Sequence, residues 1–152
     1  MQDIISPNRS LSINFNKVFA YVYRFAQKIF HKEVYMNKED AKEVSIIYAL
    51  SLLGKPTGEM FNSSLDFVEE VLKAVGMIEE EKDYSMEDMK KKFSKIEYPV
   101  RGSIIFFSEG ERERIGICLN EFLFVEFWEE SKNVRIRPIR NRKINCVVNP
   151  YI

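Results

Sequence analysis

Residues 114–127 read RIGICLNEFLFVEF, two short apolar runs on either side of a polar turn, and they are the strongest local indication of the architecture. Runs of this length that are rich in Ile, Val and Phe are typical of neighbouring β-strands. Comparable runs lie on both sides, and five of them together cover residues 102–108, 114–120, 121–130, 133–141 and 143–149. The C-terminal part of the chain is therefore predicted to form an antiparallel meander of about five strands.

Upstream of residue 102 the spacing of apolar residues and the helix start and stop signals replace the strand pattern. Three segments are expected to form helices: residues 15–30, 37–53 and 63–76. A charged connection over residues 77–99 is expected to be solvated, with a short helix from Met86 to Phe93. Helices followed by strands in one small chain predict an α+β fold, with the N-terminal helices packed on one side of the sheet.

The composition limits the classes of function. The chain has 152 residues, of which 45% are hydrophobic, so one domain spanning residues 1–152 is the simplest organisation. Lys and Arg together number 23, as do Asp and Glu, which disfavours nucleic acid as a partner. No apolar run is long enough for a membrane span, and the N-terminus lacks the features of a signal peptide, so a cytoplasmic location is expected.

Five short motifs follow one another in a recognisable order: LGKPT, NSSLDFV, GSIIFF, RIGICLN and FVEF, which begin at residues 53, 62, 102, 114 and 124. This order resembles the NlpC family of bacterial cell-wall endopeptidases, which have the papain-like cysteine peptidase fold. The resemblance covers roughly residues 45–139. It implies a core over that range, an N-terminal helical extension over residues 1–44 and a C-terminal strand over residues 140–152.

At the positions that match the family's catalytic residues, this chain has Ser63 for the cysteine nucleophile, Arg114 for the histidine base and Glu126 for the third polar group. A serine hydroxyl needs a base to remove its proton. Arg114 cannot act as that base because guanidinium does not deprotonate in proteins. Glu126 beside an arginine would have a lowered pKa, which makes it a weaker base. No residue is therefore expected to be catalytic.

Each of the three positions also has a purely structural interpretation. Ser63 followed by Asp66 fits the Ser-x-x-acid capping pattern, in which the hydroxyl and the carboxylate each accept a backbone N–H at the helix start. We favour this role over that of a nucleophile. Arg114 and Glu126 lie on adjacent predicted strands, so they either form a cross-strand ion pair or both face solvent.

The family pattern also marks positions for binding. Asn62 replaces the family's aspartate and Thr57 its tyrosine, and with Ser64 and Trp128 they are the predicted binding residues. Trp128 lies among glutamates and is either an exposed contact anchor or a buried residue. Arg135 and Arg137 are expected on one face of a strand, as a basic edge that meets an acidic partner or discourages edge pairing.

The remaining reactive side chains have ordinary explanations. His31 is the single histidine, and a position at the end of the first predicted helix favours a dipole partner over a relocated base. Cys118 and Cys146 lie in apolar runs, so we expect free thiols rather than a disulfide. No metal and no cofactor are predicted.

Three functions compete at this level. The first is a catalytically inactive NlpC-like domain that binds or scaffolds, with cell-wall peptide or a protein as the partner. The second is an active hydrolase of the same fold that uses Ser63 with Glu126 or His31 as the base. The third is an unrelated small β-barrel interaction domain behind a helical segment. The resemblance favours the first, and no oligomeric state is predicted.

Overall fold

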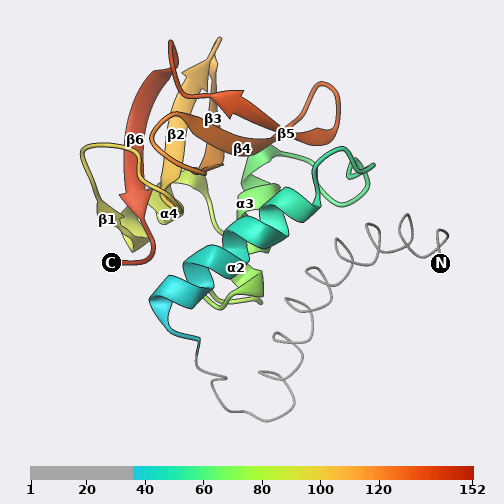
Figure 1. The fold of residues 1–152 in the computed structure, drawn as a ribbon. Coiled ribbons are helices and arrows are strands. Elements are labelled where there is room, and N and C mark those ends of the chain that lie inside the picture. The colour runs from blue at the N-terminus through green and yellow to red at the C-terminus, as the bar shows by residue number, and fades with distance from the viewer. Residues whose placement is uncertain (1–35) are drawn as a thin grey trace, which may run out of the picture.

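The computed structural model describes residues 36–152, so the helix predicted over residues 15–30 and His31 lie outside the described part. The described elements are the helices α2 (Lys38–Ser51), α3 (Ser64–Ala74) and α4 (Met86–Lys92) and the strands β1 (Ser94–Lys95), β2 (Ile104–Glu109), β3 (Arg112–Cys118), β4 (Leu123–Trp128), β5 (Asn133–Pro138) and β6 (Lys143–Asn149). The α+β class predicted from the sequence is confirmed, and Figure 1 shows the helices on one side of the strands. The division at residues 44 and 139 stays a prediction.

The helices begin and end where the sequence signals stand. Asn37 caps α2, because its side chain accepts a hydrogen bond of 2.8 Å from the backbone N–H of Asp40. Gly54, with φ +68°, follows α2, and Gly76, with φ +76°, follows α3. Glycine occupies this left-handed conformation without the penalty that a Cβ atom carries, so Gly76 ends α3 directly after its C-cap Val75, and Gly54 redirects the chain three residues after α2 ends at Ser51.

The six strands form one antiparallel sheet in the order β1-β6-β2-β3-β4-β5. A meander runs from β2 to β5, as expected, but β6 does not follow β5. It returns to pair with β2 on the other side, and β1 is a sixth, unpredicted strand at that edge. The reason lies in β2, whose residues Ile104–Phe107 are all buried. A strand buried on both faces is typical of a sheet interior, with a neighbour on each side.

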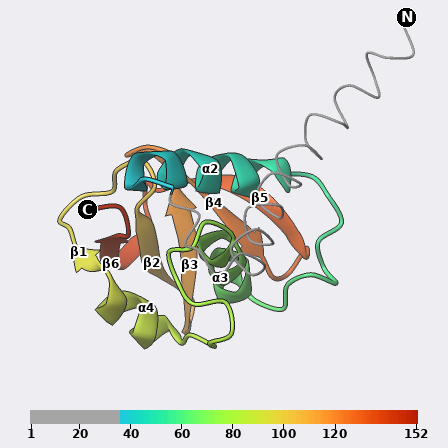
Figure 2. The same cartoon turned by 90° about the horizontal axis from the view of Figure 1, so that it is seen from below.

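The two faces of the sheet have different partners. On one face α3 packs against β3 and β4, and Phe67, Val71, Ile115 and Phe127 all lie in the larger apolar core there. Figure 2 shows α3 in front of the strands on this side, with α2 beside it. The opposite face has a smaller apolar cluster: Ile105, Phe107, Cys118, Phe124 and Ile139. Alternation along β3 and β4 therefore sends neighbouring residues to two different environments.

The connection over residues 77–99 is more than the solvated segment that we expected. Ile78, Tyr84 and Met89 belong to the larger core, and Met89 is completely buried. A capping box between Ser85 and Asp88 starts α4, which confirms the short helix predicted here. The apolar side of α4 is thus part of the folded core, whereas Lys91 and Lys92 are exposed and Lys90 pairs with Glu113 on β3. Within residues 36–152, no helix has the length and apolarity that a membrane span requires.

Candidate functional site

Ser63 lies at the N-terminus of α3 and caps it. Its backbone is extended, and its hydroxyl accepts the backbone N–H of Asp66 at 3.1 Å. The Asp66 carboxylate accepts the N–H of Asn62 at 2.9 Å, so the reciprocal half of the predicted box falls on the preceding residue and not on Ser63. The capping role of Ser63 is confirmed, and the expectation of a full capping box at α3 is wrong. A two-sided box is present at α4 instead.

Ser64 attaches the start of α3 to the sheet. Its side chain is buried, and its hydroxyl accepts the backbone N–H of Ile115 on β3 at 3.3 Å. Its own backbone N–H donates to Glu129, which follows β4, at 3.2 Å. These contacts hold the helix N-terminus against β3 and the end of β4, the two strands that carry Arg114 and Glu126. This is the arrangement that the order of motifs implies.

Arg114 and Glu126 form the predicted cross-strand ion pair. Arg114 Nη2 lies 3.5 Å from Glu126 Oε1. Both side chains project from the sheet face opposite α3, since Ile115 and Phe127 beside them face the helix. Arg114 is 3% exposed and Glu126 0%, so the alternative in which both face solvent is wrong.

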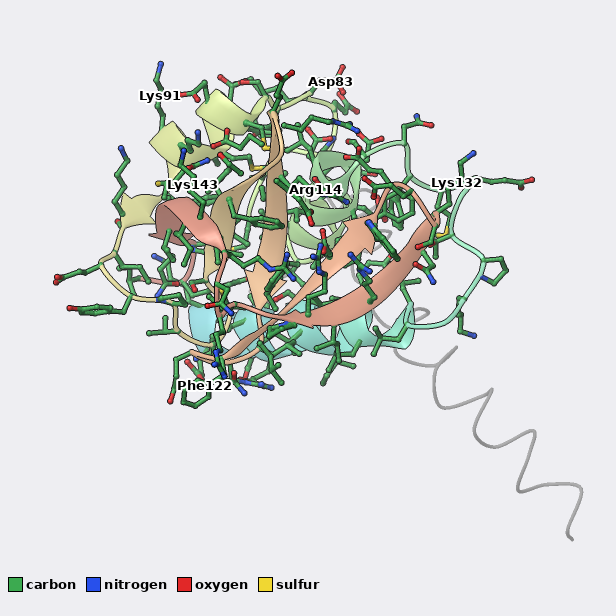
Figure 3. The ribbon with its side chains drawn as sticks, turned by 90° about the horizontal axis from the view of Figure 1, so that it is seen from above. Asp83, Lys91, Arg114, Phe122, Lys132 and Lys143 are labelled. Carbon is green, nitrogen blue, oxygen red and sulfur yellow. The ribbon has the colours of Figure 1, made fainter. Side chains whose placement is uncertain are left out.

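The ion pair belongs to a larger set of charges that we call the arginine–glutamate network: Glu109, Arg114, Glu126, Glu130, Arg135, Arg137 and Arg142. Arg137 connects its centre, donating to Glu126 at 2.8 Å and to Glu109 at 3.0 Å. The hydrogen bond from Arg137 holds the pKa of Glu109 below its ordinary value. Figure 3 shows Arg114 over the strands, among the nitrogen- and oxygen-bearing ends of neighbouring side chains.

Only part of this network is predictable from the sequence. Arg135 and Arg137 do lie on one face of β5, as predicted, and β5 is an edge strand. Glu109 and Glu130 were missed. The signal for Glu109 was available, because strand alternation from Ile105 and Phe107 places it on the face that carries Arg114. Glu130 lies beyond the end of β4, where alternation gives no direction.

The chemistry open to Ser63 follows from these contacts. Among residues 36–152, the Ser63 hydroxyl has one hydrogen bond, the one it accepts from the Asp66 N–H. The Glu126 carboxylate is engaged by three arginines, of which Arg137 is the nearest. This carboxylate also projects from the sheet face opposite α3, whose N-terminus carries Ser63. The described residues therefore supply no base to Ser63.

The four predicted binding residues lie in different environments. Asn62 is exposed beside Ser63, whereas Ser64 is buried in its hydrogen bonds to the sheet. Thr57 is 1% exposed, and its buried hydroxyl has no hydrogen-bond partner within the described part of the chain. Trp128 is half-buried under Arg135, whose guanidinium carbon lies 3.2 Å from the ring centroid. Their role in binding stays a prediction.

An open groove of about 810 Å³ lies between the loop after α2 and the turn between β4 and β5. Its lining residues are Gly54, Lys55, Pro56, Gly58, Glu59, Ser131, Lys132 and Asn133. None of the residues that match the family's catalytic positions lines it. The groove forms between two loops that are distant in the chain, so no local sequence pattern indicates it.

The thiols and the acidic side chains show no further reactive centre in the described residues. Both cysteines are free, as predicted. Burial raises the pKa of the Cys118 thiol to about 11. Within residues 36–152, no group of three or more His, Cys, Asp or Glu side chains is arranged to hold a metal ion.

Comparison with known proteins gives a likeness of fold. No family model matches the chain, and no curated protein matches it by sequence. The peptidoglycan hydrolase RipB from Mycobacterium tuberculosis has a solved structure that matches with a TM-score of 0.65 and 14% sequence identity. The match covers 95% of this chain and 86% of that one. This likeness supports the NlpC-like fold that the order of motifs implies, and at this identity it concerns the fold alone.

Proposed function

We propose that this chain is a non-catalytic module of NlpC-like fold that binds peptide fragments of the bacterial cell wall. RipB, which has a similar fold, is a peptidoglycan hydrolase, and this supports a wall peptide as the ligand class. The retained architecture without a working proton acceptor supports binding in place of cleavage. A cytoplasmic location is part of the same proposal.

One observation carries the proposal. Glu126, at the position of the family's third polar group, is completely buried and is paired with Arg114, Arg135 and Arg137. A carboxylate that leaves a buried network of this kind exposes unpaired cations, which costs about 3–5 kcal/mol. This cost opposes any rearrangement that would bring Glu126 to the Ser63 hydroxyl as a base.

The arginine at the base position adds to this argument. Arg114 donates to both carboxylate oxygens of Glu130, at 3.1 and 3.2 Å, and to the carbonyl oxygen of Phe127 at 3.5 Å. Its guanidinium remains protonated at any pH at which a protein folds. Arg114 occupies the sequence position of the family's base, but its side chain projects from the sheet face opposite α3, so this position offers Ser63 no proton acceptor.

The test compares cleavage with binding. Purified peptidoglycan and soluble muropeptides are incubated with the wild-type chain, with Ser63→Ala, and with RipB as the positive control, and the products are separated by mass spectrometry. We expect products from RipB only. In a parallel sedimentation assay, we expect both the wild-type chain and Ser63→Ala to pellet with insoluble peptidoglycan.

Two outcomes would contradict the proposal. Turnover that is present in the wild-type chain and lost in Ser63→Ala would establish an active hydrolase, which is the competing function. If the chain neither cleaves peptidoglycan nor pellets with it, the wall peptide is excluded as the ligand.

A further inference from the structure

Arg135 on the edge strand β5 has an unusual lack of acceptors. Its guanidinium lies over Trp128, with its carbon 3.2 Å from the ring centroid. Its Nε lies 3.7 Å from the nearest Glu126 oxygen, which is too far for a hydrogen bond, and this buried Nε has no partner among residues 36–152. The side chain is 25% exposed, so part of the guanidinium remains open to a ligand.

The carboxylates that could serve Arg135 are already used by other arginines. Glu126 accepts a hydrogen bond of 2.8 Å from Arg137 and pairs with Arg114. Glu109 pairs with Arg137 at 3.0 Å and with Arg142 at 3.5 Å. The arginine–glutamate network has four arginines and three glutamates, which leaves a formal excess of one positive charge.

The same imbalance appears in the electrostatics of the arginines. Burial, followed by the charge of Arg137, lowers the pKa of Arg135, and the same two causes lower the pKa of Arg142. Both groups stay protonated, because guanidinium does not lose its proton in proteins. A partly buried cation with unsatisfied donors is costly, and an added anion would offset that cost.

Charge and shape select the kind of anion. A guanidinium presents a planar pair of donors that matches a carboxylate in bidentate geometry, and the stacking of Arg135 on Trp128 fixes the direction of that pair. An excess of one charge is matched by a singly charged carboxylate. A phosphate dianion would leave a negative excess beside Glu126 and Glu109.

We propose that Arg135, held over Trp128, binds the free carboxylate of a peptide on the outer face of the hairpin formed by β4 and β5. The choice of a peptide as the ligand rests on the proposed function, whereas the choice of a carboxylate rests on the network itself. Neither Arg135 nor Trp128 lines the open groove, although Asn133, the cross-strand partner of Trp128, does.

The experiment uses the full chain and its own reporter. Trp128 is the single tryptophan of the sequence, so the indole fluorescence and the indole N–H resonance report this site without labelling. The probes are N-acetyl-alanyl-alanine with a free carboxylate, the same dipeptide as its C-terminal amide, and inorganic phosphate. We expect the free carboxylate to shift the Trp128 signals with a Kd on the order of 1 mM, and the amide to leave them unchanged.

Variants separate a specific site from general charge. Arg135→Gln should weaken binding of the free carboxylate about tenfold or more, since it removes the charged hydrogen-bond donors. Arg140→Gln removes the same charge from an exposed residue outside the network and should change the Kd less than about twofold. Arg135→Lys keeps the charge and loses the planar donor pair, so it should also weaken binding. Thermal unfolding checks that each variant is folded.

Several results would overturn this inference. If the amide binds as tightly as the free carboxylate, the site does not recognise the carboxylate. If phosphate binds more tightly than the dipeptide, the ligand is not a peptide. If Arg135→Lys binds the dipeptide with the wild-type affinity, or if Arg140→Gln loses as much affinity as Arg135→Gln, then net charge alone explains the binding. Cleavage of peptidoglycan through Ser63 would overturn the proposed function and leave the carboxylate site standing, so the two failures are distinguishable.

Discussion

At the scale of single residues, Ser63 shows how one side chain can keep a position and change its role. The hydroxyl at the start of α3 accepts the N–H of Asp66, one of the backbone donors that a helix leaves unpaired in its first turn. A nucleophile at this position would need its proton removed, whereas a cap needs only an oxygen lone pair. The observed contact satisfies the second requirement.

We therefore expect Ser63→Ala to lower the free energy of unfolding by about 1 kcal/mol, because the Asp66 N–H loses its acceptor. Ser63→Asp should restore most of this loss, since a carboxylate also caps and favours the positive end of the helix dipole. Urea denaturation followed by circular dichroism measures both variants. If Ser63→Ala is as stable as the wild-type chain, the capping role is unimportant.

The two cysteines give a second prediction at this scale. Cys118 is completely buried, and burial raises its pKa to about 11, so little thiolate is present at pH 8. Cys146 is half-buried. We expect iodoacetamide at pH 8 to label Cys146 first and Cys118 only after the addition of denaturant, as measured by peptide mass spectrometry. Faster labelling of Cys118 in the folded chain would show that it is accessible.

At the scale of elements, the strands were predictable because the information is local. Apolar runs and the turns between them placed β2 to β6 in the sequence, and a short helix was expected from Met86 to Phe93, where α4 lies. Strand order was not predictable in the same way. β6 pairs with β2 across a long stretch of chain, and β1 has two residues, too few to carry a pattern.

The contacts of the candidate site also separate into those that local sequence predicts and those that it does not. The cap at Ser63 follows from the local Ser-x-x-acid pattern, and the pair between Arg114 and Glu126 follows from their positions on adjacent predicted strands. Arg142, by contrast, lies beyond β5 and joins the network only because the chain turns back over the sheet to pair with Glu109. Local sequence patterns cannot predict contacts between segments that are brought together only by the path of the chain.

The network that β2, β3, β4 and β5 share yields a prediction about buried charge. Glu126→Gln removes the central carboxylate, which is 0% exposed, and leaves three arginines facing a neutral amide. We expect this change to lower the free energy of unfolding by about 3–5 kcal/mol. Glu130→Gln is the matched control. Its side chain is 57% exposed, so the loss should stay below about 1 kcal/mol.

Both variants are measured by urea denaturation at pH 7. Equal effects at the two positions would mean that burial does not decide the strength of these ion pairs. A stabilising Glu126→Gln would mean that the network is held at a net cost to the fold, as can occur for buried ion pairs.

At the scale of the whole molecule, the two faces of the sheet are stabilised by different interactions. The face toward α3 buries the larger apolar core, and the opposite face combines a smaller apolar cluster with the arginine–glutamate network. Fold stability thus depends on carboxylates as well as on apolar packing. This dependence makes the stability of the chain sensitive to acid.

The pKa values of Glu43, Glu109 and Glu130 are all lowered in the folded chain, with arginines among the causes. A carboxyl group with a lower pKa when folded stabilises the fold at pH values above its unfolded pKa. That contribution is lost as the pH falls through the folded value. We therefore expect the unfolding temperature to be flat near neutral pH and to fall as the pH drops below about 4.5.

Glu109→Gln should flatten this acid dependence, because it removes the carboxylate that pairs with Arg114, Arg137 and Arg142. Glu111→Gln, at an exposed position nearby, is the matched control and should leave the dependence unchanged. Differential scanning calorimetry from pH 3 to pH 7 measures both variants. An acid dependence that Glu109→Gln leaves intact would place the sensitivity in carboxylates outside the network and would separate the stability of the chain from its buried charges.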